Sequence, residues 1–305
     1  MTTPKSTTEM TTETTLKTTP ETTKTTTSEV LPKMILTTAE SRPRLIATDL
    51  DGTVVRSDGS VSARTAAAFA RVQEAGADFV FVTGRPPRLM DAIVEMFGPR
   101  GTAICSNGAL IYDMRTRAVV AEYSIDTVTL AEAARRLRTA VPGIGLAVEH
   151  ADELHADEQY EAGDWDSDIT VQRPGEDKLW SRPAPKLVGR HPSLSADDLL
   201  ALAAPAIGDL VTVYHSNGER LVEAIGSGVS KAQGLARFAA GLGITPAEVA
   251  AFGDMPNDLP MLAWAGSSYA VANAHPSVLG AVDHVIGSHD EDGVAEVVER
   301  MFPLG

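Results

Sequence analysis

The sequence lacks a second cysteine, an excess of basic side chains and a long apolar run. Its single cysteine, Cys105, cannot form an intramolecular disulfide, which is compatible with a reducing compartment. The formal net charge of −15 is opposite to the basic footprint that nucleic acid or an anionic membrane surface requires. No run approaches the roughly 20 apolar residues needed to cross a bilayer. We therefore expect a cytoplasmic protein that binds neither nucleic acid nor membranes, and the sequence leaves its oligomeric state open.

The length and the composition predict more than one compact unit. A chain of 305 residues exceeds the usual single domain of roughly 100–200, and 43% hydrophobic residues can form a full core. Residues 1–40 differ from the rest, because threonine dominates the stretch from Thr2 to Thr27 and little of it can be buried. We expect a disordered tail there. Two alternatives stay open: the threonines could be modified or bind a partner, or translation could start at Met34.

From Arg44 onward, short apolar runs alternate with amphipathic helices. Strands are predicted at 45–48, 79–82 and 249–252, and helices at 62–75, at 230–242 and after Asp292. This alternation at both ends of the region predicts an α/β fold with a doubly wound, Rossmann-like parallel sheet. Such sheets bind their ligands at the carboxyl ends of the strands.

The middle of the chain is less regular and predicts a second α/β unit inserted into the first. Its predicted elements are strands at 110–112 and 119–123 and helices at 130–140 and from Ser195. We expect this insertion to span 87–226, so that the sheet domain comprises 41–86 and 227–305. An acidic, turn-rich stretch, 149–168, is most simply a solvated surface. If it borders the site, it should disfavour substrates with extra negative charge, such as bisphosphates.

Two aspartates follow the first predicted strand, in Thr48-Asp49-Leu50-Asp51-Gly52-Thr53. Acids at positions i and i+2 of a strand share a face. Carboxylates are costly to cluster unless a cation or another partner offsets their repulsion. An EF-hand calcium loop is excluded, because its twelfth position would be Ser60, where a carboxylate is required. A plain turn remains the alternative to a functional site.

Three further segments favour function. Thr83-Gly84-Arg85 lies between a strand and a helix, where free backbone N–H groups and a hydroxyl form an anion site. Lys231 falls in the first turn of its helix, where a cation opposes the helix dipole unless an anion is bound nearby. Gly253-Asp254-Met255-Pro256-Asn257-Asp258 places two more carboxylates after a strand, and such hard oxygen ligands suit Mg²⁺.

These four segments, in this order, resemble the haloacid dehalogenase superfamily, and specifically its Cof-like phosphatases with a type IIB cap. The resemblance extends from about Arg44 to the C-terminus. Further similar stretches are Ser106-Asn107-Gly108-Ala109, Gly228-Val229-Ser230-Lys231, Asn257-Asp258-Leu259-Pro260-Met261-Leu262 and Asp292-Gly293-Val294.

The resemblance implies a role for each matching residue. Asp49 would be the nucleophile that forms an aspartyl-phosphate, and Asp51 the general acid and then the base that activates water. Thr83 and the backbone of Gly84 would hold the phosphate, and Lys231 would neutralise charge on the phosphoryl group. This distribution agrees with the physics of phosphoryl transfer, in which charge spreads over the equatorial oxygens.

The resemblance also implies a Mg²⁺ cofactor. Asp49, the backbone carbonyl of Asp51 and Asp254 would bind the ion, with Asp258 binding it directly or supporting the other ligands. Asn257 belongs to the same motif. Asn107 either contacts the substrate phosphate or forms a turn, and the sequence does not distinguish these two roles.

The predicted function is hydrolysis of a small phosphomonoester of a sugar, a polyol or a cofactor. A phosphomutase, similar to the phosphomannomutases, would keep every motif but exclude water from the phosphoenzyme. A catalytically silent binding module is the third alternative, which the intact set of Asp49, Asp51, Lys231 and Asp254 disfavours. Within the insertion, surface or core packing is the favoured role of four aromatic residues, namely His150, His155, Trp165 and Trp180.

Overall fold

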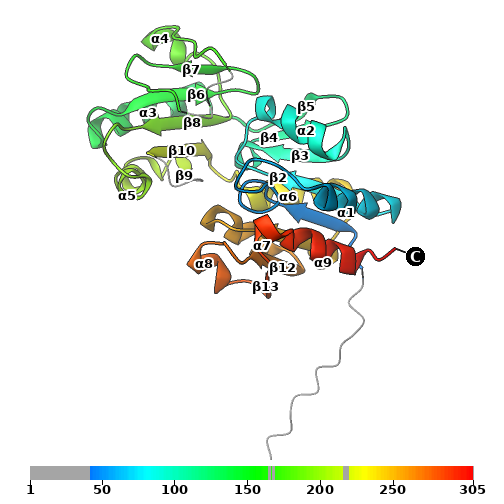
Figure 1. Cartoon of the computed structure of the whole chain (residues 1–305). Coiled ribbons are helices and arrows are strands. Elements are labelled where there is room, and N and C mark those ends of the chain that lie inside the picture. The colour runs from blue at the N-terminus through cyan, green and yellow to red at the C-terminus, as the bar shows by residue number, and fades with distance from the viewer. Residues whose placement is uncertain (1–41, 164–165, 167–168, 216–219, 305) are drawn as a thin grey trace, which may run out of the picture. The chain divides into compact units, whose positions relative to one another are not determined.

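The structure is a computed structural model that describes residues 42–163, 166, 169–215 and 220–304. The predicted tail, 1–40, and Trp165 lie outside these described residues. The described chain forms two β-sheets, one of eight strands and one of five (Figure 1). This part of the chain contains no helix that combines the length and the apolar character of a membrane span.

The eight-stranded sheet has the strand order β13-β12-β11-β1-β2-β3-β4-β5. The strands are β1 (Leu45–Thr48), β2 (Asp78–Val82), β3 (Thr102–Cys105), β4 (Leu110–Asp113), β5 (Ala118–Glu122), β11 (Val249–Gly253), β12 (Ser267–Val271) and β13 (His284–Ile286). The pairings from β13 through β3 are parallel, whereas β4 and β5 add to the edge in antiparallel fashion. All four residues of β1 are buried, as expected of a central parallel strand covered on both faces.

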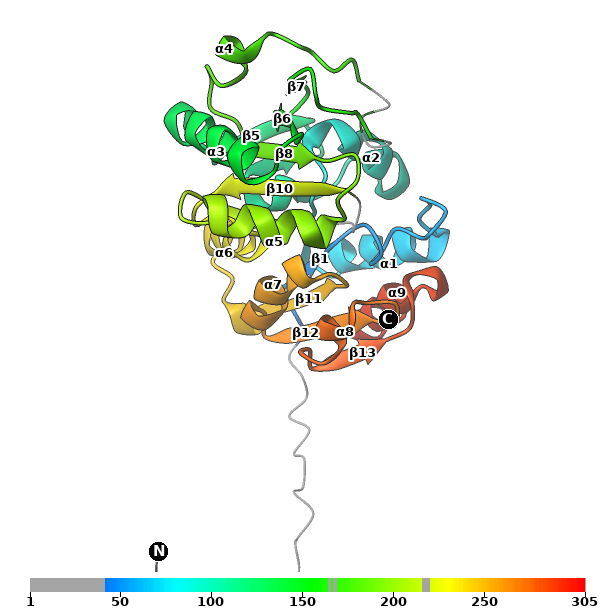
Figure 2. The ribbon, with the colours of Figure 1, turned by 90° about the vertical axis from the view of Figure 1, so that its left-hand side faces the viewer.

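Helices cover both faces of this sheet, which confirms the predicted doubly wound α/β fold. Figure 2 shows α6 (Lys231–Gly241) on one side and α1 (Ala63–Glu74) and α9 (Gly293–Met301) on the other. The remaining helices are α2 (Asp91–Phe97), α7 (Leu259–Trp264) and α8 (Pro276–Leu279). Ser62 accepts the N–H of Thr65 at the start of α1, as its N-cap pattern predicts.

The five-stranded sheet belongs to residues 124–226, which we call the cap. Its order is β7-β6-β8-β10-β9, and its pairings are antiparallel. The strands are β6 (Gly145–Glu149), β7 (Leu154–Ala156), β8 (Lys186–Arg190), β9 (Val211–Tyr214) and β10 (Leu221–Gly226). The helices are α3 (Thr127–Ala140), α4 (Glu176–Leu179) and α5 (Ala196–Ile207). Apolar side chains of α3, α5 and this sheet form a hydrophobic core of their own.

The structure corrects the predicted start of the insertion at residue 87. Strand β3 pairs with β2, with Thr102 opposite Val80, and the β4–β5 hairpin continues the same sheet. The chain therefore leaves the large sheet only after β5. Antiparallel strands need no crossover helix, so the local pattern of β4 and β5 does not reveal which sheet they join.

Candidate active site

The predicted site residues follow the carboxyl ends of neighbouring parallel strands. Asp49 follows β1, Thr83 follows β2 and Asp254 follows β11, so all three lie at one edge of the sheet. The N–H of Asp49 donates to the carbonyl of Phe252 on β11 at 3.0 Å. The sheet therefore brings together motifs that are far apart in the sequence. Thr53 and Asp254, for example, are separated by 201 positions and form a hydrogen bond.

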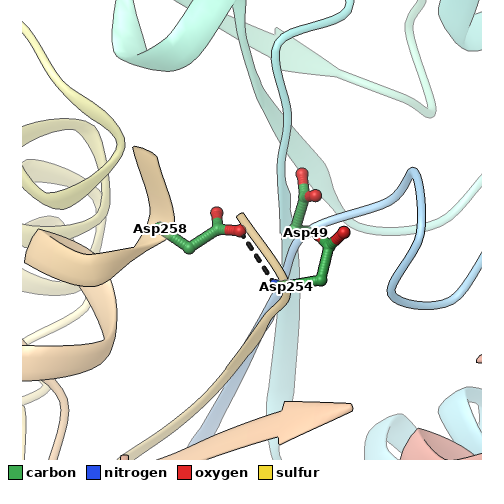
Figure 3. A group of neighbouring side chains, drawn as sticks. All are labelled: Asp49, Asp254 and Asp258. Atoms are coloured by element: carbon green, nitrogen blue, oxygen red, sulfur yellow. Dashed lines mark hydrogen bonds between the residues drawn. The ribbon is translucent and has the colours of Figure 1, made fainter. Parts of the chain in front are cut away.

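Three carboxylates form a buried cluster at this edge. Asp49, Asp254 and Asp258 each offer an oxygen, and these oxygens lie within 4.8 Å of one another (Figure 3). Burial, reinforced by the neighbouring acids, raises the pKa of Asp49 well above its ordinary value. Burial and the charge of Asp258 raise the pKa of Asp254 to about 6. Such a cluster is costly unless positive charge accompanies it.

Lys231 supplies one positive charge to this cluster. It is the first residue of α6, and its Nζ lies 2.7 Å from Oδ1 of Asp49 and 2.7 Å from Oδ1 of Asp258. Burial alone would lower the pKa of Lys231, but the two carboxylates outweigh this effect and raise it. The lysine thus stays charged. The negative charges of Asp49 and Asp258 offset the unfavourable interaction of this cation with the N-terminal end of the helix dipole.

Asp258 organises the turn that carries Asp254. Its Oδ2 accepts the N–H groups of Asp254, at 3.1 Å, and of Met255, at 3.0 Å, while its Oδ1 faces Lys231. Both oxygens are therefore engaged by the protein. Asp254 is fixed separately, because the hydroxyl of Thr53 donates to its Oδ1 at 3.0 Å. Thr53 was not assigned a role from the sequence, although it stands in the first motif.

Asp51 is not one of the three clustered carboxylates, and its side chain pairs with Arg85. The guanidinium Nε lies 2.8 Å from Oδ2 of Asp51, and the Asp51 side chain is 40% exposed. Asp51 is the least enclosed acid of the site. The sequence placed Arg85 in the second motif but gave it no role; its charge beside the predicted phosphate turn was the available signal.

The turn Thr83–Arg85 is held by backbone contacts. The buried hydroxyl of Thr83 accepts the N–H of Arg85 at 3.0 Å, and its carbonyl accepts the N–H of Asn107 at 2.9 Å. Asn107 has a left-handed backbone, with φ of 52°. Its side chain donates to Tyr214 and accepts from Asn257. These contacts support the turn-forming role of Asn107.

A cavity of about 110 Å³ lies between the sheet edge and the cap. Asp49, Asp51, Gly84, Lys231 and Asn257 line it from the sheet domain. The polar residues that line it from the cap are Glu149, Tyr160, Asp166, Lys186, Arg190 and Glu223. Glu149, Tyr160 and Asp166 belong to the stretch 149–168, for which the sequence leaves open a position bordering the site, whereas none of the other three is predicted from the sequence.

The expectation of a solvated acidic surface at 149–168 is wrong for Glu149 and Asp166. Both side chains are 7% exposed, and Arg88 approaches them at 3.0 Å and 3.5 Å respectively. Glu149 ends β6, whose five residues are all buried. The apolar run before Glu149 was the signal that its carboxylate enters the interior.

Three of the four aromatic residues singled out in the cap pack within it, as expected. Trp180 joins the hydrophobic core of the cap, and its Nε1 donates to Glu176 at 2.8 Å. The rings of His150 and His155 meet edge to face, with centroids 5.4 Å apart. Among the described residues, these three side chains are not part of the cavity lining.

Comparison with known proteins places this site in a family. The sequence profile of the haloacid dehalogenase-like hydrolases matches residues 46–298. The phosphoglycolate phosphatase of Halorubrum lacusprofundi is 32% identical over 260 residues, which cover 83% of this chain and 95% of that protein.

Solved structures show the same fold. A HAD/COF-like hydrolase from Plasmodium vivax has a TM-score of 0.76 at 21% identity, over 87% of this chain and 97% of that chain. The HAD subclass IIB sugar phosphatase BT4131 has a TM-score of 0.71 at 18% identity, over 84% of this chain and 98% of that chain.

The chain belongs to the family of haloacid dehalogenase-like hydrolases. The resemblance drawn from the four motifs is confirmed, and so is the predicted enzyme class, a hydrolase.

Proposed function

We propose that this hydrolase is a Mg²⁺-dependent phosphatase that acts on small phosphomonoesters through an aspartyl-phosphate on Asp49. The observation that carries the proposal is the position of Asp49 in the lining of the cavity. Its carboxylate is held by Lys231 at 2.7 Å and stands beside Asp254 and Asp258. A nucleophilic carboxylate, a fixed cation and an acidic cluster at one sheet edge are the components that phosphoryl transfer needs.

The acidic cluster suits a small divalent cation. Asp49 and Asp254 are buried carboxylates in direct interaction, and the pKa of each is raised. Both oxygens of Asp258 are engaged by Lys231 and by backbone N–H groups. We therefore expect Asp49, Asp254 and the backbone carbonyl of Asp51 to hold the ion, and Asp258 to support them. Bound Mg²⁺ would neutralise charge on the phosphoryl oxygens.

The reaction follows from the chain's own residues. One oxygen of Asp49 would attack phosphorus, forming the acyl-phosphate bond as the ester P–O bond breaks. Asp51, within reach of the cavity, would protonate the leaving oxygen and then take a proton from the water that releases phosphate. Arg85 would orient the Asp51 carboxylate, and Lys231 would favour the ionised form of Asp49 and oppose the charge that develops on phosphorus.

The size and lining of the cavity favour a small, polar ester. About 110 Å³ leaves room for only a few polar groups beyond the phosphate. The cap presents cations and acids that face one another, such as Lys186 with Glu149 and Glu223. A sugar, polyol or cofactor phosphate, with hydroxyl groups that can donate and accept, fits such a surface. The relative from Halorubrum lacusprofundi is named for phosphoglycolate, which is also a small phosphate ester but one of a hydroxy acid, outside the sugar, polyol and cofactor phosphates.

The test is release of inorganic phosphate from a panel of phosphorylated metabolites. We expect release with Mg²⁺, none after chelation, poor support by Ca²⁺ because of its looser geometry, and none from Asp49→Asn. The same assay separates a phosphatase from a phosphomutase, which keeps water from the phosphoenzyme. Full activity after exhaustive chelation, or in Asp49→Asn, contradicts the proposal.

A further inference from the structure

Lys186 is a buried lysine of the cap that faces the site across the cavity. It begins β8 and is 3% exposed. Its Nζ lies 3.0 Å from Glu149 and 2.7 Å from Glu223, and it donates to the backbone carbonyl of Gly84 at 2.8 Å. An ammonium group has three N–H donors. Gly84 and Glu223 each accept one of them, whereas the contact with Glu149 is an ion pair, because Oε2 of Glu149 has no hydrogen-bond partner among the described residues.

The partner of Lys186 in the sheet domain is the glycine of the predicted phosphate turn. Each carbonyl of this turn has a different donor: Thr83 accepts from Asn107, Arg85 accepts from Ser106, and Gly84 accepts from Lys186. The first two donors belong to the sheet domain, and the third comes from the cap. Because glycine has the freest backbone, holding the peptide planes on both sides of Gly84 fixes its conformation.

A second tie between the same two regions strengthens this arrangement. Arg88 lies four residues after Gly84, in the short helix Pro87–Met90. Its backbone N–H donates to the carbonyl of Ala151, in the cap, at 3.0 Å. Its guanidinium lies 3.0 Å from Glu149, which also pairs with Lys186. The segment that begins at the phosphate turn is therefore held by cap residues at both ends.

We propose that Lys186 is a positioning residue that completes the phosphate turn from the cap, by fixing the peptide of Gly84, and that it does not bind the leaving group. The proposal rests on the proposed function, since that function makes this turn the phosphate-holding element. It assigns to the cap a part in phosphate binding that is the same for every substrate.

Lys186 could position the phosphate turn or bind the leaving group. These two roles predict different effects of removing Lys186 on the affinity for inorganic phosphate, because inorganic phosphate has no leaving group. We would measure phosphate affinity by calorimetry on Mg²⁺-saturated protein, and kcat/KM for p-nitrophenyl phosphate and for glycerol phosphate. In Lys186→Met, all three should fall by the same factor. We expect roughly ten- to a hundredfold, as for loss of a hydrogen bond from a charged donor.

A charge-balanced double variant is the control for loss of activity through misfolding. Lys186→Met leaves two buried glutamates with less positive charge, so Lys186→Met/Glu223→Gln is measured beside it, with the melting temperature of each. The double variant should show the same uniform loss. Unchanged phosphate affinity in either folded variant, or losses that differ between the two esters, would overturn the positioning role. If the wild-type protein neither binds inorganic phosphate nor releases phosphate from esters, the proposed function is wrong instead.

Discussion

The ammonium of Lys231 lies 2.7 Å from Oδ1 of Asp49, although 182 positions separate the two residues in the sequence. Lys231 begins α6 and Asp49 follows the central strand β1. The same ammonium lies 2.7 Å from Asp258, so one buried cation serves two buried carboxylates. Removing one member of a buried ion cluster is strongly destabilising, because the remaining charges lose their compensation.

Lys231→Met should therefore destabilise the metal-free protein by about 3–5 kcal/mol. The loss should be smaller with saturating Mg²⁺, since the cation supplies charge at the same cluster. Urea unfolding in chelator and in Mg²⁺ measures both values. Lys178→Met, at an exposed lysine of α4, is the control and should stay within about 0.5 kcal/mol of wild type. Equal losses in the two buffers would mean that Mg²⁺ binds elsewhere.

Gly52→Ala tests how tightly Asp254 is placed. Gly52 has φ of 76°, and a methyl group there would overlap Oδ2 of Asp254. Gly59 is a matched control, because its φ is 81° and a methyl group there meets open space. Both substitutions should cost about 1–2 kcal/mol of backbone strain. Gly52→Ala alone should also lose phosphate release, on the order of a hundredfold, because a catalytic group is displaced.

The measurements are denaturant unfolding, for the loss of stability, and phosphate release, for the loss of activity, in the two alanine variants. Equal activity in Gly52→Ala and Gly59→Ala would show that the position of Asp254 is not critical.

His150→Gln should flatten the acid side of the pH–stability curve. Burial, followed by the charges of Arg182 and His155, lowers the pKa of His150 to about 4. Between the unfolded value of about 6.5 and about 4, the unfolded chain therefore binds more protons, so stability falls as the pH falls through this window. Protonation would also repel Arg182, whose Nε approaches His150 Nε2 at 3.3 Å.

The measurement is the free energy of unfolding at several values of pH from 7 to 4. His284→Gln, at an exposed histidine of the large sheet, is the control and should follow the wild-type curve. A wild-type slope in His150→Gln would show that another group dominates acid destabilisation.

The sequence predicted the half of the site that follows the parallel strands. Asp49, Thr83 and Asp254 each stand directly after a strand, and the carboxyl ends of parallel strands meet at one edge, so their proximity follows from local pattern. The role of Thr53 beside Asp254 was hidden, because it depends on a contact across 201 positions.

The cap side could not be predicted in the same way. Glu149 and Lys186 are direct partners across two antiparallel strands, and this register is fixed by the packing of the cap and not by either segment alone. The same limit explains the misplaced boundary at residue 87, since β4 and β5 carry ordinary strand patterns and only their pairing assigns them to the large sheet.

Asp49 and Asp51 are assigned different roles, although they stand two positions apart. Asp49→Asn removes the attacking oxygen, so no phosphoenzyme can form. Asp51→Asn keeps the backbone carbonyl and loses only the proton-transfer group, which is normally worth roughly 10²–10⁴ in rate. With p-nitrophenyl phosphate the leaving group needs little protonation, so phosphoenzyme forms in Asp51→Asn while its hydrolysis stays slow.

Acid quench of each variant after mixing with radiolabelled p-nitrophenyl phosphate measures this difference directly. We expect protein-bound label in Asp51→Asn and none in Asp49→Asn. Label in Asp49→Asn, or normal hydrolysis of the ester by both variants, would contradict the assigned roles.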